Sequence, residues 1–154
     1  MADLFNGKSH VGLDEQYNRD YECLTSGKNE LKIADVYFIC LIMGYRNNAK
    51  IISKNQKGKE FRPSYFTSLQ RNLLCGLILN LPGITPEDIV DDTKINLIFE
   101  NLTEYANGGL QWIREHVFGD VLNDRGEIDV DSETVIVRLN EMIHDEINPE
   151  KAPF

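Results

Sequence analysis

Apolar side chains recur at helical spacing through most of the chain. The strongest pattern covers residues 33–41, where apolar residues recur at i, i+3, i+4, i+7 and i+8. The run Val36–Met43 is apolar without interruption, and a helix that is apolar on nearly all sides is buried on several of them. We predict a central core helix here, ending near Gly44 as a left-handed C-cap. Its most buried residues are expected to be Val36, Phe38, Ile39, Cys40 and Leu41.

A longer apolar stripe runs from Ile95 to Val117 and includes the pair Gly108–Gly109. Glycine costs about 0.8–1 kcal/mol relative to alanine inside a helix, so an adjacent pair needs a structural reason. The apolar phase is the same before and after the pair, whereas a tight turn would usually reset it. We therefore predict one long helix whose glycines allow close approach of another helix, the one containing Val36–Met43. Two helices joined at Asn107–Gly108 are the alternative.

Weaker signals predict the remaining elements. A first helix is expected over 13–24 and a third from an N-cap at Ser64 to Leu81, with a short helix following near 85–90. The third helix carries an apolar stripe formed by Leu69, Leu73, Gly76 and Leu77. A last helix is expected from Asp131–Ser132 to the stop at Asn148–Pro149.

In residues 46–61 the apolar residues do not follow helical spacing. We interpret this segment either as a loop with some extended character or as a basic β-hairpin. The prediction is therefore an all-α or mainly α fold: a five-to-six-helix bundle with a possible small β-hairpin near residues 50–61. Residues 1–154 are expected to form a single helical domain, with 1–10 as a flexible tail.

Composition limits the classes of protein to consider. No apolar run reaches the roughly 18–20 residues of a membrane span, and the first residues lack the basic and apolar regions of a secretory leader. Cys23, Cys40 and Cys75 are widely separated, which favours neither a disulfide framework nor a zinc site. We expect a cytoplasmic protein with no membrane association.

Catalytic motifs are not evident in the sequence. It contains no HExxH, GxSxG, Walker A or GxGxxG pattern. Adjacent acids such as Glu87–Asp88 and Asp91–Asp92 fit the starts of helices, where the helix dipole favours negative charge. We therefore expect no enzyme activity, no catalytic residues, no metal site and no cofactor.

Charge is distributed unevenly along the chain. The net charge is −9, and residues 87–150 hold seventeen acids against four bases. Positions 46–71, by contrast, contain seven basic residues and a single acidic residue, Glu60. They are Arg46, Lys50, Lys54, Lys57, Lys59, Arg62 and Arg71.

These seven residues are the candidate binding site for nucleic acid or for a partner. Phosphates attract mobile positive charge, and bases stack on aromatic rings such as those of the neighbouring Tyr45 and Phe61. A solvated surface loop, docking to an acidic protein, and docking to the acidic half of a second copy are the other interpretations.

Two segments resemble a known family. The segment Ala34–Arg46 contains an acid, then a helix of apolar and aromatic residues, and it ends with a glycine and an aromatic residue before a basic loop. The segment Glu104–Leu110 contains the paired glycines. Both resemble small Dnd-associated accessory proteins, which are encoded beside bacterial DNA-phosphorothioation and restriction systems. Neither motif is catalytic, so the resemblance implies a context of defence against foreign DNA and assigns no site residues.

Three functions remain open on these grounds. The first is a non-catalytic accessory or interaction protein of a bacterial DNA-modification or restriction-type defence system, which contacts DNA weakly and non-specifically through the basic segment, or contacts other defence-system proteins. The second is an acidic helical adaptor or inhibitor that binds a protein partner and no DNA. A small hydrolase with an unrecognised site is the third. The oligomeric state does not follow from the sequence.

Overall fold

The computed structural model describes residues 3–27 and 30–147, and helices dominate them. The α-helices are α1 (Asn18–Leu24), α2 (Ile33–Arg46), α3 (Ser68–Leu79), α4 (Pro86–Ile89), α5 (Ile95–His116) and α6 (Ser132–Ile147). Two short strands, β1 (Val11–Gly12) and β2 (Glu60–Phe61), pair antiparallel. The mainly α prediction with a small β element is confirmed. The predicted stop at Asn148–Pro149 lies outside the described residues.

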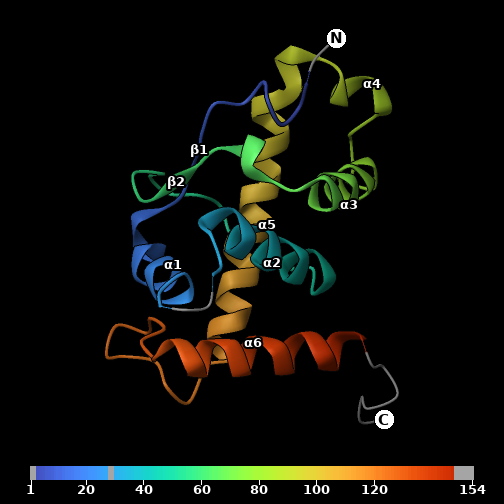
Figure 1. Ribbon diagram of the computed structural model, residues 1–154. Helices are drawn as coiled ribbons and strands as arrows, with labels where there is room; N and C mark the ends of the chain where they lie inside the picture. The colour runs from blue at the N-terminus through green and yellow to red at the C-terminus, as the bar shows by residue number, and fades with distance from the viewer. Residues whose placement is uncertain (1–2, 28–29, 148–154) are drawn as a thin grey trace.

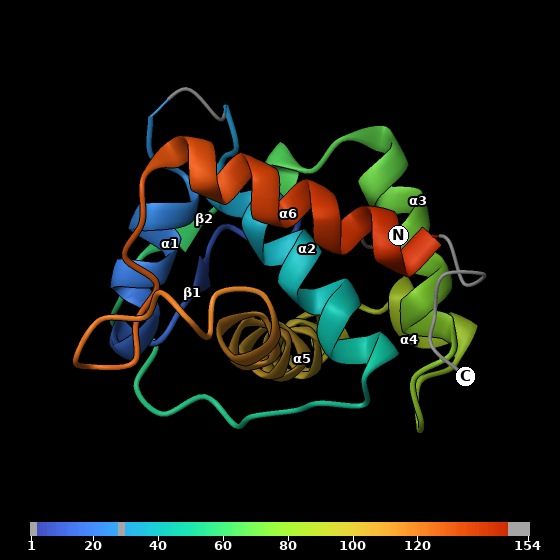
Figure 2. The ribbon, with the colours of Figure 1, turned by 90° about the horizontal axis from the view of Figure 1, so that it is seen from below.

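The long helix α5 is the axis around which the other elements pack. Figure 1 shows α2 crossing its middle, α6 lying across its C-terminal end, and α3 and α4 beside its N-terminal half. Seen along α5, helix α2 lies on one side of it and the connection from α2 to β2 on the other (Figure 2). Helix α5 is therefore enclosed between a helix and a loop.

The crossing of α2 and α5 depends on glycine. A Cβ atom on Gly109 would overlap the carbonyl oxygen of Cys40, and one on Gly44 would overlap that of Tyr105. The two backbones are thus in direct contact, with Cys40 and Leu41 fully buried at the crossing. The predictions of one unbroken helix and of close approach to the helix containing Val36–Met43 are both confirmed.

The second glycine of the pair has a different neighbour. A Cβ on Gly108 would overlap the carbonyl oxygen of Ala49, in the loop that follows α2. The prediction assigned both glycines to a helix contact, and for Gly108 this is wrong. Because consecutive helical residues point about 100° apart, adjacent glycines open α5 on two sides.

The ends and faces of α2 differ from expectation. Gly44 is not a left-handed cap, because α2 continues to Arg46 and the positive φ falls at Asn48. Val36, Cys40 and Leu41 are buried as predicted, but Phe38 and Ile39 are only partly buried. They lie on the side of α2 that faces away from α5, where no element covers them completely.

The N-terminal residues also differ from expectation. Residues 1–10 were expected to form a flexible tail, yet Leu4 and Phe5 are 4% and 5% exposed and belong to the core. The Phe5 ring packs edge-on against Phe66 and Phe99, with centroid separations of 5.9 and 6.4 Å. The apolar pair Leu4–Phe5 is too short to show periodicity, so the sequence pattern does not predict that these residues are buried.

Helix α3 begins later and faces differently from the prediction. Ser64 lies in a 3-10 turn, and the N-cap is Thr67, which forms a capping box with Gln70. Leu77 is buried as expected, but Leu69 and Leu73 are 68% and 51% exposed. The core side of α3 is formed instead by Leu74, Leu77 and Ile78.

The β element has a long-range partner. Strand β2 pairs with β1, which joins Val11 to Phe61 and Gly12 to Glu60. The β structure expected near 50–61 is therefore closed by the N-terminal segment, which fixes the far end of the loop after α2.

Candidate functional site

The segment between α2 and β2, residues 47–59, is called the basic loop below. It carries Lys50, Lys54, Lys57 and Lys59 of the seven candidate residues. The loop contains no regular secondary structure, so its backbone polar groups must find partners elsewhere. Those partners decide whether the loop can present its charges in a fixed arrangement.

Helices α2 and α5 fix the first part of the loop. The Ala49 amide donates to the Gly44 carbonyl at 2.8 Å, and the Ile51 amide donates to the Glu104 carbonyl at 2.9 Å. Asn107, which is buried in α5, donates through its Nδ2 to the Ile51 carbonyl at 3.1 Å and to the Ser53 hydroxyl at 3.2 Å. The loop is thereby attached along the side of α5 that faces away from α2.

A single carboxylate fixes the middle of the loop. Asp14 is 1% exposed and accepts hydrogen bonds from three consecutive amides. The Lys54 amide donates to it at 2.7 Å, the Asn55 amide at 3.3 Å and the Gln56 amide at 3.0 Å. Charge-assisted bonds of this kind are roughly twice as strong as neutral ones. Asp14 therefore holds the turn from which Lys54 and Lys57 extend.

The far end of the loop is attached to the N-terminal segment. The Gly58 amide donates to the Leu13 carbonyl at 2.7 Å, and the Lys59 amide donates to Asn18 Oδ1 at 2.9 Å. The next residues along the chain form β2, which pairs with β1. The basic loop is thus anchored at its start, middle and end, and it is a fixed surface feature.

Four of the seven candidate bases are engaged within the molecule. Arg46 pairs with Glu146 at 3.0 Å, Lys50 with Glu104 at 3.8 Å and Lys59 with Glu22 at 3.5 Å. Arg71 donates to the Phe66 and Ser64 carbonyls at 3.1 and 2.6 Å, and it lies over the Phe5 ring. These four side chains therefore already have partners within the molecule.

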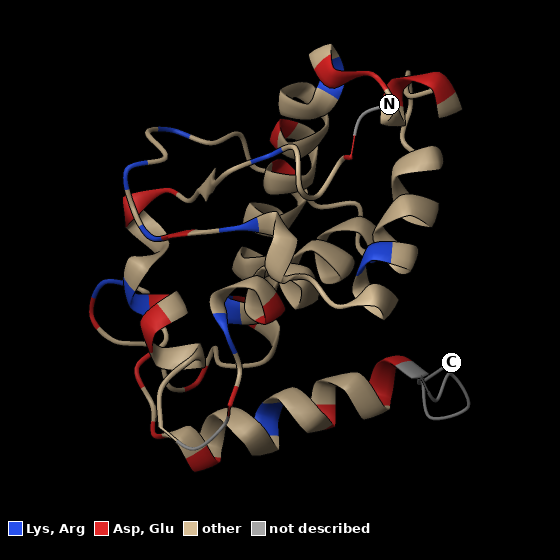
Figure 3. Ribbon diagram, turned by 45° about the horizontal axis from the view of Figure 1, so that its top comes forward, with Lys and Arg blue, Asp and Glu red and all other residues tan. Residues whose placement is uncertain are grey.

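Three of the seven candidates remain exposed with no side-chain partner among the described residues. They are Lys54 and Lys57 on the loop and Arg62 just after β2. Figure 3 shows that basic positions recur along the loop between α2 and β2 while acidic positions lie on neighbouring elements. These three are therefore the candidate bases whose charges are not already paired within the described residues.

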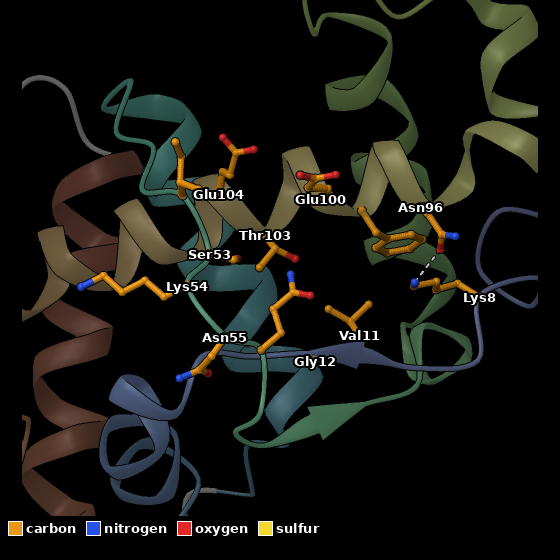
Figure 4. Close-up of a pocket in the computed structure, with 13 residues that line it drawn as sticks. Lys8, Val11, Gly12, Ser53, Lys54, Asn55, Asn96, Glu100, Thr103 and Glu104 are labelled. Atoms are coloured by element: carbon orange, nitrogen blue, oxygen red, sulfur yellow. Dashed lines mark hydrogen bonds between the residues drawn. The ribbon is translucent and has the colours of Figure 1, made fainter.

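A pocket of about 470 Å³ lies beside the loop, between residues 52–56, β1 and the N-terminal half of α5. Lys8 and Lys54 lie at its opposite ends, and Lys8 donates to Asn96 Oδ1 at 2.6 Å (Figure 4). Glu100 and Glu104 line the α5 side. Because two carboxylates face two ammonium groups, the pocket has no net positive charge, so the outer edge of the loop is the better place for an anion.

Three buried titratable groups, Cys40, Tyr37 and Asp20, lie elsewhere, in the core. Burial raises the pKa of the Cys40 thiol and of the Tyr37 phenol well above their ordinary values. Burial also raises the pKa of the Asp20 carboxyl, although hydrogen bonds from Arg114 and the Ile128 amide oppose the shift. All three side chains are completely enclosed by packed structure, at 0% exposure.

No group of three or more His, Cys, Asp or Glu side chains among residues 3–27 and 30–147 is arranged to hold a metal ion. Within the same residues, no helix has the length and apolar character needed to cross a bilayer.

Comparison with known proteins adds no relative. No protein-family model matches the chain, and the comparisons with curated proteins and with solved structures give no match.

Sequence reasoning missed the residues that organise the site. Asp14 lies beside Glu15 in the first turn of the helix expected over 13–24, and nothing in the local pattern links it to residues 54–56. Asn107 offered a better signal, because a polar residue on the apolar face of a long helix needs a hydrogen-bond partner. Lys8 was assigned to the tail.

Proposed function

We propose that the protein is a non-catalytic accessory protein of a bacterial DNA-modification or restriction-type defence system, and that it contacts the DNA backbone through the basic loop. The resemblance of Ala34–Arg46 and Glu104–Leu110 to Dnd-associated proteins supports the context. The anchoring of the loop by Asp14 supports the contact, and it is the observation on which the proposal depends.

Anchoring of the basic loop lowers the entropy cost of binding. A lysine on a mobile loop loses backbone freedom when it binds. In this loop three backbone amides already donate hydrogen bonds to Asp14, so that freedom is lost during folding and not on binding. Lys54, Lys57 and Arg62 are the side chains that we propose to contact phosphates. Contacts to phosphates carry no sequence information, so the proposed contact is independent of DNA sequence.

The expected affinity is low. Three phosphate contacts predict a slope of log K against log salt of about −2.7 for duplex DNA. The net charge of −9 opposes approach over a Debye length of about 8 Å at physiological salt. The dissociation constant should be on the order of 10⁻⁴–10⁻⁶ M, typical of non-specific binding.

Fluorescence anisotropy with labelled duplex and single-stranded DNA at several salt concentrations tests this proposal. The variant Lys54→Ser/Lys57→Ser/Arg62→Ser should bind at least about tenfold more weakly and show a flatter salt dependence, because the released counterions are those of its three contacts. The matched control Lys32→Ser/Lys94→Ser/Arg125→Ser removes the same charge away from the loop. It should keep the slope of the wild type.

An equal loss of DNA affinity in both variants would mean that net charge, and not the basic loop, determines binding. Absence of binding by the wild type at low salt would overturn the DNA contact, and the acidic adaptor that binds a protein partner would then be the better account.

A further inference from the structure

The pocket between the basic loop, β1 and the N-terminal half of α5 is called the loop pocket below. Its volume of about 470 Å³ lies within the roughly 300–1,000 Å³ of small-molecule sites. Val11 and Phe99, which are 3% and 2% exposed, form its buried base, and polar side chains form most of its walls. A cavity of this size and lining suits a small polar molecule.

The loop side of the pocket is held in one conformation. Gln56 lines it with a φ of 53°, in the left-handed region that residues other than glycine rarely adopt. Its amide donates to Asp14 Oδ1 at 3.0 Å, and its carbonyl oxygen would lie 2.8 Å from a Cβ added to Gly12. Strained backbone of this kind persists only where the surrounding structure holds it, and it clusters at ligand sites. This wall of the loop pocket is therefore preformed.

The α5 side of the pocket presents a row of polar side chains. Asn96, Glu100 and Thr103 line it, and their i, i+4, i+7 spacing places them on one face of the helix. Lys8 Nζ donates to Asn96 Oδ1 at 2.6 Å, which fixes an ammonium group at the start of the row (Figure 4). An ammonium group has three hydrogens, so two remain for other acceptors. Seven helical residues rise about 10 Å, which separates Asn96 from Thr103 along α5.

The hydroxyl of Thr103 needs an acceptor. Thr103 is 1% exposed, and its Oγ1 lies 2.8 Å from the buried hydroxyl of Tyr37. Two hydroxyls bring two hydrogens to this contact, and the contact uses one of them. In the part of the chain that the structure describes, neither hydroxyl has a second hydrogen-bond partner. Of the two, Thr103 lines the pocket, so the pair is satisfied when Tyr37 donates to Thr103 and Thr103 donates to an acceptor in the cavity.

Three charged side chains of the pocket are available to a ligand. Glu104 already pairs with Lys50 at 3.8 Å. Within the described residues, the side chains of Glu100 and Lys54 have neither a hydrogen bond nor an ion pair. Together with Lys8 they supply an ammonium group at each end of the pocket and a carboxylate on α5 between the two ends (Figure 4). A molecule that complements them carries two negative groups and one positive group between them.

We propose that the loop pocket binds a free acidic α-amino acid of the size of glutamate. Its α-carboxylate accepts from the Thr103 hydroxyl and contacts Lys54. Its ammonium group contacts Glu100, one helical turn before Thr103, and its side-chain carboxylate extends past Asn96 to Lys8. This inference goes beyond the proposed function and does not depend on it, because glutamate and DNA are tested by separate titrations.

An NMR titration of the labelled full chain at constant ionic strength tests the proposal with three ligands. L-glutamate should shift the amides of residues 11–12, 53–56 and 100–103 with a dissociation constant on the order of 10⁻⁴ M, as expected for a small ligand. Glutarate lacks the ammonium group, and L-glutamine has a neutral side chain in place of the second carboxylate. Each should bind at least about tenfold more weakly, because each leaves one charged group of the pocket without its partner.

Two variants assign the contacts. Glu100→Gln should weaken glutamate binding at least tenfold and remove the preference for glutamate over glutarate. Lys8→Gln should remove the preference for glutamate over glutamine. The matched controls Glu115→Gln, an exposed acid farther along α5, and Lys57→Gln, a loop base outside the pocket lining, should bind glutamate like the wild type. Thermal melts of all four variants should match the wild type, because none of the substituted side chains is buried.

The absence of saturable shifts at these residues with about 10 mM glutamate would overturn the proposal. Equal affinity of the wild type for glutamate and glutarate, or equal losses in Glu100→Gln and Glu115→Gln, would also contradict it. In the second case net charge, and not the pocket, would determine binding.

Discussion

At the scale of single residues, the contact that shapes this molecule is the one made by Gly109. No other residue type fits there, because the carbonyl of Cys40 occupies the position of its Cβ. The neighbouring backbone is held by α2 and cannot rotate away as a flexible side chain would. The glycine therefore has a packing role, and its ordinary cost inside a helix is offset by the crossing it permits.

We expect Gly109→Ala to destabilise the fold by about 3 kcal/mol, the upper end for overpacking, because backbone must move to admit the methyl group. Gly76→Ala is the matched control: it lies within α3 with open space around it and should stabilise by up to about 1 kcal/mol. Urea unfolding of both variants measures the difference. Equal free energies of unfolding would contradict the account of the crossing.

A second residue-scale prediction concerns the buried ion pair of Asp20 and Arg114. Asp20 is fully buried, accepts from Arg114 Nε at 3.1 Å and from the Ile128 amide at 2.9 Å, and joins α1 to α5. Asp20→Asn leaves the Arg114 charge without its partner and should cost about 3–5 kcal/mol. Asp129→Asn, at an exposed pair with Arg19, is the control, because exposed pairs contribute only about 0–1 kcal/mol. Chemical denaturation compares them, and similar losses would refute the assignment.

Residues of this kind are predictable only when the local pattern points to them. The preserved apolar phase around Gly108–Gly109 identified a close contact, and the structure places one there. The partner of Gly108 was not predictable, because Ala49 reaches it through a loop with no periodic pattern. Asp14 was equally invisible, since its three amide partners lie about forty residues away.

At the scale of elements, the basic loop behaves as a structural unit although it has no regular secondary structure. Its order comes from groups outside it: Asp14, Asn18 and Asn107. Removing one of them should therefore loosen the loop and leave the helical core intact.

Asp14→Asn tests this directly. An amide oxygen accepts less strongly than a carboxylate, and the Nδ2 group cannot accept from the loop amides, so hydrogen bonds worth about 1–3 kcal/mol are lost. Hydrogen exchange of the amides of residues 54–56 should accelerate by about tenfold or more, while α5 amides keep their protection. The exposed neighbour Glu15→Gln is the control. Unchanged exchange at residues 54–56 in Asp14→Asn would show that the loop is ordered by something else.

Elements with strong periodicity were predicted better than those whose position depends on tertiary contacts. Helix α5 was predicted as one helix because its apolar phase never slips. Helix α3 was predicted to exist, but its stripe through Leu69 and Leu73 was assigned to the core and is exposed. Apolar spacing identifies a face without saying what covers it. The partner of β2 could not be predicted, because two-residue strands have almost no sequence signal.

At the scale of the whole molecule, the two segments on which the proposed defence-system context depends meet in space. Ala34–Arg46 contains Cys40 and Gly44, and Glu104–Leu110 contains Tyr105 and Gly109, which are the residues of the helix crossing. The proposed context therefore depends on residues that build the scaffold. The candidate contact with DNA lies in the loop between them, and its support comes from charge and anchoring.

The most direct test of the central claim is an NMR titration of the labelled full chain with a short DNA duplex at low salt. Amide shifts should change at residues 52–59 and at Arg62, should saturate weakly, and should return towards their free values as salt is added. Changes confined to α3 and α6, or no changes at any DNA concentration, would contradict the claim that the anchored basic loop is the DNA contact.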